Sequence, residues 1–333
     1  MPTPESSSQT AFESIEQAVQ ADLQRVQDTI RRTLLTDKPF LAERLKNLTE
    51  NPGKMLRPRL LLLSARACGQ AKPIHIDLAA IVELIHTATL LHDDVVDRAV
   101  LRRGRLSANA LWGNTAAVLL GDFLLSRALA LGARLRPPVI SEQILQTAQQ
   151  ICEGELLQNY HRGDWQISEE LYRQIIASKT AALFAFSCTL GAQWAEADET
   201  SVESLAKYGR YLGLAFQIRD DAMDLFSSER KTGKTVRTDL AEGKPTLPVI
   251  LWLKTLSNKE KQRAVVSLGD PKKHKTIAKQ IKQSPVLLHV KRRIEHLKKK
   301  ACDCLKPLTD SPAKDALCRL AEEIAEDLGP LLR

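Results

Sequence analysis

The sequence predicts an all-α fold, a single-domain bundle of roughly ten or more helices, on three observations. Aromatic residues make up only 5% of the 333 residues, whereas Leu and Ala are abundant, which favours helix over strand. Proline is absent from residues 74–136 and 139–244, so long uninterrupted helices can form there. Apolar residues in these stretches recur at three- and four-residue steps, as in Ile81, Leu84 and Ala88. The sequence contains no series of alternating strands and no glycine-rich phosphate loop, either of which would argue against a helical bundle.

The extent of this domain follows from composition. Residues 1–12 begin with the polar stretch MPTPESSSQT, which lacks the basic-then-apolar order of a signal peptide, and we expect a disordered N-terminal tail there. No shift in composition divides the remainder, so residues 13–333 are predicted to form one domain.

The six cysteines are scattered and lack zinc-site spacing, which favours reduced thiols and a cytoplasmic location.

The positive charge of the chain is concentrated near its C-terminal end. The formal net charge is +8, yet residues 271–300 hold eleven Lys or Arg and one Glu, a net charge of +10. A solvated helical face accounts for such a segment, and so does a surface attracted to anionic lipid at the edge of a membrane. The segment contains no Trp, Tyr or Phe to stack on bases, so no nucleic-acid partner is expected.

Two short stretches, LLHDDVVD and FQIRDDAMD, carry the same Asp-Asp-x-x-Asp pattern 127 residues apart. On a helix, residues three and four apart share a face, so each stretch projects three carboxylates together. Like charges on one turn repel each other unless cations lie between them, and hard carboxylate oxygens select Mg²⁺, Mn²⁺ or Ca²⁺. The metal-ligand candidates are Asp93, Asp94, Asp97, Asp220, Asp221 and Asp224.

Basic residues accompany both aspartate clusters. Mg²⁺ completes its coordination shell with water and phosphate oxygens, so cations beside such a cluster suggest a diphosphate site. The candidates lie in the stretches NPGKMLRPRL, LRRG and GKTVRTDLAEGKPTLP, and they are Lys54, Arg57, Arg102, Arg103, Lys234 and Lys244. Taken together, the acidic and basic groups predict a site for two polyanions.

These motifs resemble, in order, those of the trans-isoprenyl diphosphate synthases, the polyprenyl synthetase family. The resemblance runs over roughly residues 50–250 and is strongest to long-chain bacterial enzymes typified by octaprenyl diphosphate synthase. The matching motifs are GKMLRP, ELIHTATLLHDDVVD, RRG, NALWGN, GDFLLSRAL, EGELLQ, SKT, YGRYLGLAFQIRDDAMD and DLAEGKPTLPVI.

The resemblance implies a fold and a reaction. The fold is the isoprenoid synthase fold, in which the two aspartate helices face each other across a central cavity. About three Mg²⁺ ions, for which Mn²⁺ can substitute, would bridge the aspartates to the diphosphate of an allylic substrate. Loss of that diphosphate leaves an allylic carbocation, which the double bond of isopentenyl diphosphate attacks. The product grows by one isoprene unit for each condensation.

The resemblance also assigns residues by position. Asp93, Asp94, Asp97 and Asp220 would be catalytic through the metals, and Thr180 and Gln217 would present oxygen dipoles to the carbocation. Arg102, Lys179 and Lys234 would bind the allylic diphosphate, and Lys244 is assigned to substrate binding with them. Isopentenyl diphosphate would be bound without metal by Lys54, Arg57, His86 and Arg103.

Product length is expected to depend on the residues below the first aspartate cluster. Helix geometry places Thr89 one turn below Asp93, with Ala88 beside it and Ile85 next. Short-chain members of the family carry bulky aromatics here, so the small residues predict a long all-trans product, octaprenyl diphosphate, of the kind used for quinone side chains. The alternatives are a farnesyl or geranylgeranyl diphosphate synthase, a non-catalytic subunit of a heteromeric synthase, and a terpene cyclase. The resemblance further implies a homodimer.

Four residues depart from the family pattern. Arg98 stands where an acidic residue is usual, and Arg219 directly precedes the second aspartate cluster. Arg237 and Thr238 stand where Gly and Asp are common, and a Gly there would permit positive φ. None of the four is a metal ligand or a substrate-binding candidate, so activity is expected.

Overall fold

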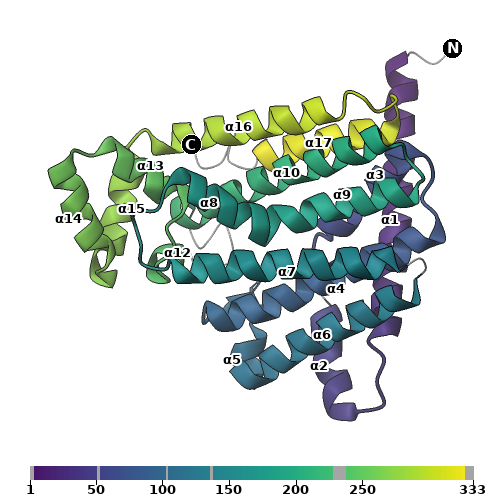
Figure 1. Cartoon of the computed structure of the whole chain (residues 1–333), viewed down its shortest axis with the longest axis horizontal. Helices are drawn as coiled ribbons and strands as arrows, with labels where there is room; N and C mark the ends of the chain where they lie inside the picture. Colours follow the sequence, from purple (N-terminus) through teal and green to yellow (C-terminus); the bar gives the residue numbers. More distant parts are fainter. Residues whose placement is uncertain (1–3, 51–52, 103, 136–137, 228–237, 327–333) are drawn as a thin grey trace.

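The computed structural model describes residues 4–50, 53–102, 104–135, 138–227 and 238–326, and these residues form a helical bundle (Figure 1). The all-α prediction is confirmed; a two-stranded hairpin is the exception in the described part of the chain. The helices are α1 (Pro4–Thr33), α2 (Pro39–Thr49), α3 (Leu56–Cys68), α4 (Pro73–Val96), α5 (Ala108–Trp112), α6 (Asn114–Arg134), α7 (Val139–Tyr160), α8 (Glu169–Ile176), η1 (Ala177–Ala181), α9 (Ala182–Trp194), α10 (Glu199–Phe226), α12 (Thr238–Ala241), α13 (Leu247–Thr255), α14 (Asn258–Leu268), η2 (Pro271–Lys273), α15 (His274–Gln283), α16 (Val286–Cys304) and α17 (Pro312–Glu326).

The N-terminal segment differs from the expectation of a disordered tail. Helix α1 begins at Pro4, so its backbone is helical over most of residues 1–12, and residues 1–3 lie outside the described part. Proline is well tolerated in the first turn of a helix, where no intrahelical N–H bond is lost. Further along α1, Val19, Leu23 and Val26 are buried at three- and four-residue steps against the bundle, and this apolar stripe anchors the helix.

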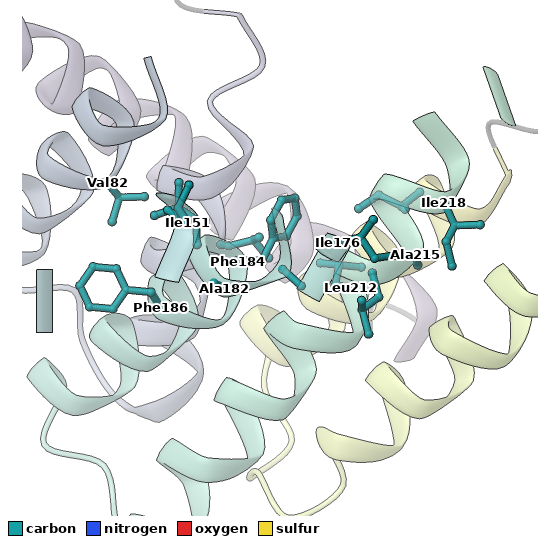
Figure 2. Packing of buried hydrophobic residues seen from close by; sticks show 14 of the residues in the cluster. Val82, Ile151, Ile176, Ala182, Phe184, Phe186, Leu212, Ala215 and Ile218 are labelled. Atoms are coloured by element: carbon teal, nitrogen blue, oxygen red, sulfur yellow. The ribbon is translucent and has the colours of Figure 1, made fainter. Parts of the chain in front are cut away.

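The core lies where α3, α4, α9 and α10 pack together. Four consecutive leucines of α3, residues 60–63, are completely buried, which shows that α3 is surrounded by other elements. Figure 2 shows Phe184 of α9 between residues of α4 and α7 on one side and of α10 on the other. This central layer holds the C-terminal end of α4 and the C-terminal half of α10 in place, and these are the segments that carry the two aspartate motifs.

Between α8 and α9 the chain forms the π-helical segment η1, which contains Lys179 and Thr180. Isolated π turns of this kind occur frequently at functional sites. Two glycines allow neighbouring helices to approach η1 closely. A Cβ on Gly154 of α7 would lie 2.5 Å from the Lys179 backbone nitrogen, and one on Gly213 of α10 would lie 2.6 Å from Ala181 Cα. The segment is therefore held between α7 and α10.

The hairpin follows directly after the first aspartate motif. Strand β1 (Leu101–Arg102) pairs antiparallel with β2 (Arg105–Leu106), and Arg102 is opposite Arg105. Gly104 in the connecting turn has φ of 75°, a conformation that favours glycine. The hairpin thereby fixes the position of Arg102 close to the end of α4.

By length and composition alone, three described helices could span a membrane. They are α4, α6 and the continuous helix Glu169–Trp194. Two of them are largely enclosed by the bundle, since 67% of the apolar window of α4 and 72% of that of Glu169–Trp194 are buried. The corresponding value for α6 is 33%, so α6 is less enclosed, and its large apolar side chains Val118 and Leu119 are exposed.

Candidate active site

The first aspartate cluster lies at the end of α4, and each of its carboxylates contacts a basic side chain from elsewhere. Asp94 is buried and accepts a hydrogen bond from Arg102 Nε at 2.9 Å. Asp97 caps the helix, where its own N–H donates to the carbonyl of Asp93. Asp93 Oδ2 lies 3.6 Å from Lys179 Nζ. The three carboxylates lie together as predicted, and two of the predicted cations, Arg102 and Lys179, lie beside them.

Lys179 is surrounded by acceptors. Besides Asp93 it forms an ion pair with Glu155 and donates a hydrogen bond to Gln158 Oε1 at 3.0 Å. Burial raises the pKa of Asp93 to about 6, although the Lys179 ammonium acts against this shift. Burial on its own would lower the pKa of Lys179, but the negative charges of Asp93 and Glu155 have the larger effect and raise it. This lysine therefore stays protonated at neutral pH, as the binding of an anion requires.

Asp97 is held by two cations from distant segments. Lys244 Nζ lies 2.7 Å from Asp97 Oδ2, and Arg162 Nη2 lies 2.5 Å from Asp97 Oδ1. Burial alone would raise the pKa of Asp97, but the Lys244 ammonium lowers it below the ordinary value. Lys244 is itself buried and also pairs with Glu242 at 2.7 Å.

The second cluster is on the C-terminal half of α10. Asp220 is the most accessible of its three carboxylates, with 44% of the side chain exposed, and it pairs with Arg219 at 2.8 Å. Asp224 accepts bonds from the backbone and side chain of Thr238, at 3.1 and 2.9 Å. Thr238 thus reaches the cluster even though it departs from the family pattern.

Asp221 is the buried member of the second cluster. Tyr172 donates its hydroxyl to Asp221 Oδ2 at 2.6 Å, and Gln217 Nε2 donates to Oδ1 at 2.7 Å. Burial raises the pKa of Asp221 to about 6 in spite of these two bonds. Thr180 Oγ1 in turn donates to Gln217 Oε1 at 2.7 Å, so the predicted pair Thr180 and Gln217 forms a connected chain that ends at the carboxylate.

The two clusters belong to one site because the same short segments reach both. In η1, Lys179 contacts Asp93 of the first cluster, and the next residue, Thr180, reaches Asp221 through Gln217. Lys244 likewise pairs with Asp97, and its charge opposes the rise in pKa that burial causes at Asp224. A diphosphate between the clusters would be within reach of residues from both.

Divalent cations suit the donor set of this site. Oxygen donors from six aspartates are what Mg²⁺ and Ca²⁺ prefer, and the raised pKa values of Asp93 and Asp221 show that further positive charge would be stabilised there. Within the described residues, no three His, Cys, Asp or Glu side chains are placed so as to ligate one ion among themselves. Mg²⁺ typically takes one or two carboxylates and completes its shell with water and phosphate oxygens, so these residues fit ions that a diphosphate would also ligate.

Two of the predicted isopentenyl diphosphate residues, Arg57 and His86, lie together beside Phe184 of α9. Arg57 Nη1 lies 3.0 Å from His86 Nε2, and the guanidinium of Arg57 is 4.7 Å from the ring centre of Phe184. Phe184 packs on Phe216 at 5.2 Å, and Arg219 covers the Phe216 ring at 4.5 Å. The structure therefore brings Arg57 and His86 together as predicted.

The contacts given above do not include all of the predicted residues that the structure describes. Lys54 is exposed in the turn before α3. The predicted residues Arg103 and Lys234 lie outside the described residues, as does the departing residue Arg237. Arg98 has φ of 50°, an uncommon conformation for a residue other than glycine.

The predicted chain-length residues lie along α4 as helix geometry required. Ile85 and Ala88 are buried, and Thr89 is half-buried with its hydroxyl bonded to the His86 carbonyl at 2.8 Å. Deeper along α4, Leu84 and Leu124 of α6 line a cavity of about 40 Å³ together with residues of α1 and α2. Helix α6 therefore packs beside this end of α4.

Sequence reasoning did not assign several residues that contact the clusters. Glu155 and Gln158 lie in the EGELLQ motif, and Glu242 lies in DLAEGKP, so the motifs contained a usable signal. Tyr172 and Arg162 lie in no motif that was recognised, and only the folded chain brings them to Asp221 and Asp97.

Comparison with known proteins agrees with this geometry. The sequence profile of the polyprenyl synthetase family matches residues 38–284. Octaprenyl diphosphate synthase of Escherichia coli K12 is 36% identical over 313 residues, which are 93% of this chain and 97% of that protein. An all-trans-nonaprenyl-diphosphate synthase (geranyl-diphosphate specific) of Rhodobacter capsulatus is 37% identical over 278 residues, which are 83% and 85% of the two chains.

A solved structure shows the same fold. It is a polyprenyl synthase from Caulobacter crescentus, complexed with calcium and isoprenyl diphosphate, and it superposes with a TM-score of 0.88 at 34% identity. The match covers 94% of this chain and 97% of that one. Fold, sequence and the paired aspartate clusters agree, and this chain is therefore a member of the polyprenyl synthetase family, a family of trans-prenyltransferases.

Proposed function

We propose that this protein condenses isopentenyl diphosphate with an allylic diphosphate, with bound Mg²⁺, to make a long-chain all-trans polyprenyl diphosphate. The observation that carries the proposal is the connection of Asp93 to Asp221 through the adjacent residues Lys179 and Thr180. These contacts connect carboxylates of both clusters to one short segment that carries a cation, which supports a diphosphate site between the clusters. Membership of the family supports the reaction class.

In this mechanism the residues of the chain bind and orient the two substrates. Lys179 and Arg102 donate to the allylic diphosphate and stabilise the charge that accumulates on it as the C–O bond breaks. Mg²⁺, when held by the aspartates, would supply further positive charge to the same leaving group. Thr180 and Gln217 turn oxygen atoms toward the allylic carbon, and Arg57 and His86 hold the diphosphate of isopentenyl diphosphate so that its double bond faces that carbon.

The proposal of a divalent cation rests on the donor atoms. Asp93, Asp94 and Asp97 would hold ions on one side and Asp220, Asp221 and Asp224 on the other, which would require Arg102 and Lys244 to leave or share their carboxylates. The related Caulobacter crescentus protein was solved with calcium and isoprenyl diphosphate, which supports a divalent cation of this kind here.

A long product, octaprenyl diphosphate, is the length that the E. coli relative and the small residues Ala88 and Thr89 support. Other relatives carry different chain lengths in their names, among them nonaprenyl and short-chain products, so a shorter product is the alternative. Use of the product for quinone side chains is a further part of the proposal.

The exposed apolar face of α6 supports a homodimer. Leu119 on α6 is 62% exposed, and Leu145 and Leu156 on α7 are 54% and 68% exposed. We infer that these exposed leucines take part in the contact between two copies of the chain. Sedimentation equilibrium should report a dimer for the wild type and a monomer for Leu119→Glu, whereas Val266→Glu, at an equally exposed position on α14, should stay dimeric. A monomeric wild type would refute this part.

We further propose a cytoplasmic enzyme whose basic segment, residues 271–300, touches anionic membrane surface. Within that segment η2 carries Lys272 and Lys273, and both are exposed. Flotation with liposomes that contain anionic lipid should recover more protein than flotation with neutral liposomes, and high salt should abolish the difference. Equal recovery from both liposomes would argue against the contact.

The reaction itself is tested by a product assay. The purified protein is incubated with Mg²⁺, farnesyl diphosphate and labelled isopentenyl diphosphate, and the products are resolved by length after dephosphorylation. The expected result is a ladder that ends near octaprenyl and disappears with EDTA or in Asp220→Asn. A ladder that ends earlier supports the short-chain alternative, and no elongation under any condition contradicts the proposed reaction.

A further inference from the structure

A second cavity lies on the far side of the second aspartate cluster, between α8, α10 and α16. Its volume is about 650 Å³, which lies in the range of sites for one small-molecule ligand. We call it the α8–α10–α16 groove. It is distinct from the proposed diphosphate site, because none of the six aspartates lines it.

The floor of the groove is apolar. Ile176 of α8, Leu214 and Ile218 of α10 and Leu247 of α13 are buried and line it, and Leu297 of α16 covers one side. Figure 2 shows Ile176 and Ile218 along the contact between α8 and α10. Such a floor accepts a hydrocarbon chain, because removal of the chain's methylene groups from water is favourable.

The rim of the groove is cationic. Its positive side chains are those of Arg173, Lys207, Arg210, Arg293 and Lys300, with His296 beside them, against the carboxylates Glu169 and Glu170. Arg173 and Arg293 pair with the two glutamates. Arg210 has no ion pair or hydrogen bond within the described part of the chain, and Lys300 lies over the Tyr211 ring at 5.5 Å without a carboxylate partner there.

This combination of a hydrocarbon floor with a cationic rim is complementary to an anion that carries one apolar chain. We propose that the groove is a second, non-catalytic binding site for a prenyl diphosphate, with the chain on the floor and the diphosphate at Arg210 and Lys300. The proposal rests on the proposed function, because the ligand belongs to the enzyme's own substrate class. Arginine binds phosphate groups through its planar fork, which suits Arg210 to this role.

The surroundings of the groove favour a free prenyl diphosphate over a bilayer phospholipid. Large apolar side chains that are exposed in the described residues lie elsewhere, and none of them lines the groove. The groove itself therefore offers no exposed large apolar side chain to the second acyl chain of a phospholipid. A single-chain ligand of substrate size matches the volume without this cost.

One wall of the groove is in contact with the active site. Tyr172 lines the groove, and its hydroxyl bonds to Asp221 at 2.6 Å. A ligand that packs against the Tyr172 ring acts on the position of this hydroxyl. Occupancy of the groove therefore has a direct path to the second aspartate cluster.

The test is equilibrium dialysis of labelled farnesyl diphosphate against the full chain, in EDTA and saturating isopentenyl diphosphate to suppress binding in the catalytic cleft. We expect about one bound molecule for each chain, and binding at least about tenfold weaker in Arg210→Glu/Lys300→Glu, because two charge-assisted bonds to the diphosphate are lost. The charge-matched control Lys259→Glu/Lys275→Glu, at exposed positions on α14 and α15, should bind as the wild type does.

A second variant, Leu297→Trp, fills the groove without changing its charge and should also weaken binding. The proposal is overturned if the wild type binds no farnesyl diphosphate in EDTA or if the groove variants bind it as tightly as the wild type. It is also overturned if palmitate, anionic phospholipid vesicles or inorganic diphosphate displace the label as well as unlabelled farnesyl diphosphate does. The groove variants should still elongate in the Mg²⁺ assay, so loss of this site and failure of the proposed reaction give different results.

Discussion

Lys244 Nζ lies 2.7 Å from Asp97 Oδ2, although the two residues are 147 positions apart in the sequence. The lysine is buried, and burial acts to lower its pKa, yet the nearby carboxylates of Asp239, Asp97 and Glu242 raise the pKa above the ordinary value. A single ammonium group thus neutralises acids from both halves of the site. This contact joins the end of α4 to the segment that follows α12.

Replacement of this lysine should destabilise the fold. In Lys244→Met the buried carboxylates lose their cation, and removal of one partner from a buried pair costs about 3 to 5 kcal/mol of unfolding free energy. Urea denaturation at pH 7.5 measures the loss. The control Lys254→Met breaks an exposed pair with Glu169 and should cost less than about 1 kcal/mol. Similar losses in the two variants would mean that Lys244 is not the neutralising charge.

Removal of the Tyr172 hydroxyl should weaken metal use without unfolding the protein. Asp221 in Tyr172→Phe keeps the bond from Gln217 but loses one donor, so its carboxylate is less firmly positioned. We expect the Mg²⁺ concentration for half-maximal elongation to rise about three- to tenfold, from a bond worth about 0.5 to 1.5 kcal/mol. Tyr160→Phe, at an exposed tyrosine, is the control. An unchanged Mg²⁺ dependence would show that Tyr172 has only a packing role.

The carboxylate of Asp93 should destabilise the fold at high pH. In the folded protein the pKa of Asp93 is raised to about 6, above the ordinary value near 3.8 that applies to the unfolded chain. The fold therefore keeps its full stability below pH 3.8, where the carboxyl is protonated in both states. That stability is lost as the pH rises through 6 and the buried carboxyl ionises. Asp93→Asn should therefore be more stable than the wild type by about 1 to 3 kcal/mol at pH 8, with no difference near pH 4. Denaturation at the two pH values tests this, and a variant less stable at pH 8 would contradict it. The variant should not elongate.

A bulky residue below the first cluster should shorten the product. Thr89 is half-buried one turn below Asp93, and Thr89→Phe would place an aromatic ring across the predicted path of the growing chain. The ladder of the product assay should then end several units earlier, while the first condensation keeps its rate. Thr255→Phe, far along the chain on α13, should leave the ladder unchanged. The same final length in Thr89→Phe would place the path elsewhere.

The sequence could predict the helices and the aspartate clusters because that information is local. The spacing of Asp93, Asp94 and Asp97 determines a shared helix face, whatever the remainder of the fold does. The residues that contact these aspartates could not be predicted in this way. Arg162 and Tyr172 reach Asp97 and Asp221 from 65 and 49 residues away, and no short-range pattern encodes such contacts.

Two further features could not be predicted for the same reason. The sequence gives no sign that Arg219 pairs with Asp220 while it covers the Phe216 ring, because rotamer and packing decide this. The extension of α1 to Pro4 also escaped prediction, since its first residues are polar and resemble a tail. Composition describes the solubility of a segment better than its backbone conformation.

The π-helical segment Ala177–Ala181 makes this part of the chain intolerant of any change in length. A π turn holds one residue more than an α turn, so deletion of one residue here would restore a continuous α-helix from α8 into α9. The helices on either side would keep their faces, since the π turn had accommodated the additional residue, and the side chains inside the segment would change direction. Lys179 and Thr180 could no longer point to Asp93 and Gln217 while Phe184 stays in the core. A substitution in this segment changes a single side chain, whereas deletion of one residue would move both Lys179 and Thr180 relative to the two aspartate clusters.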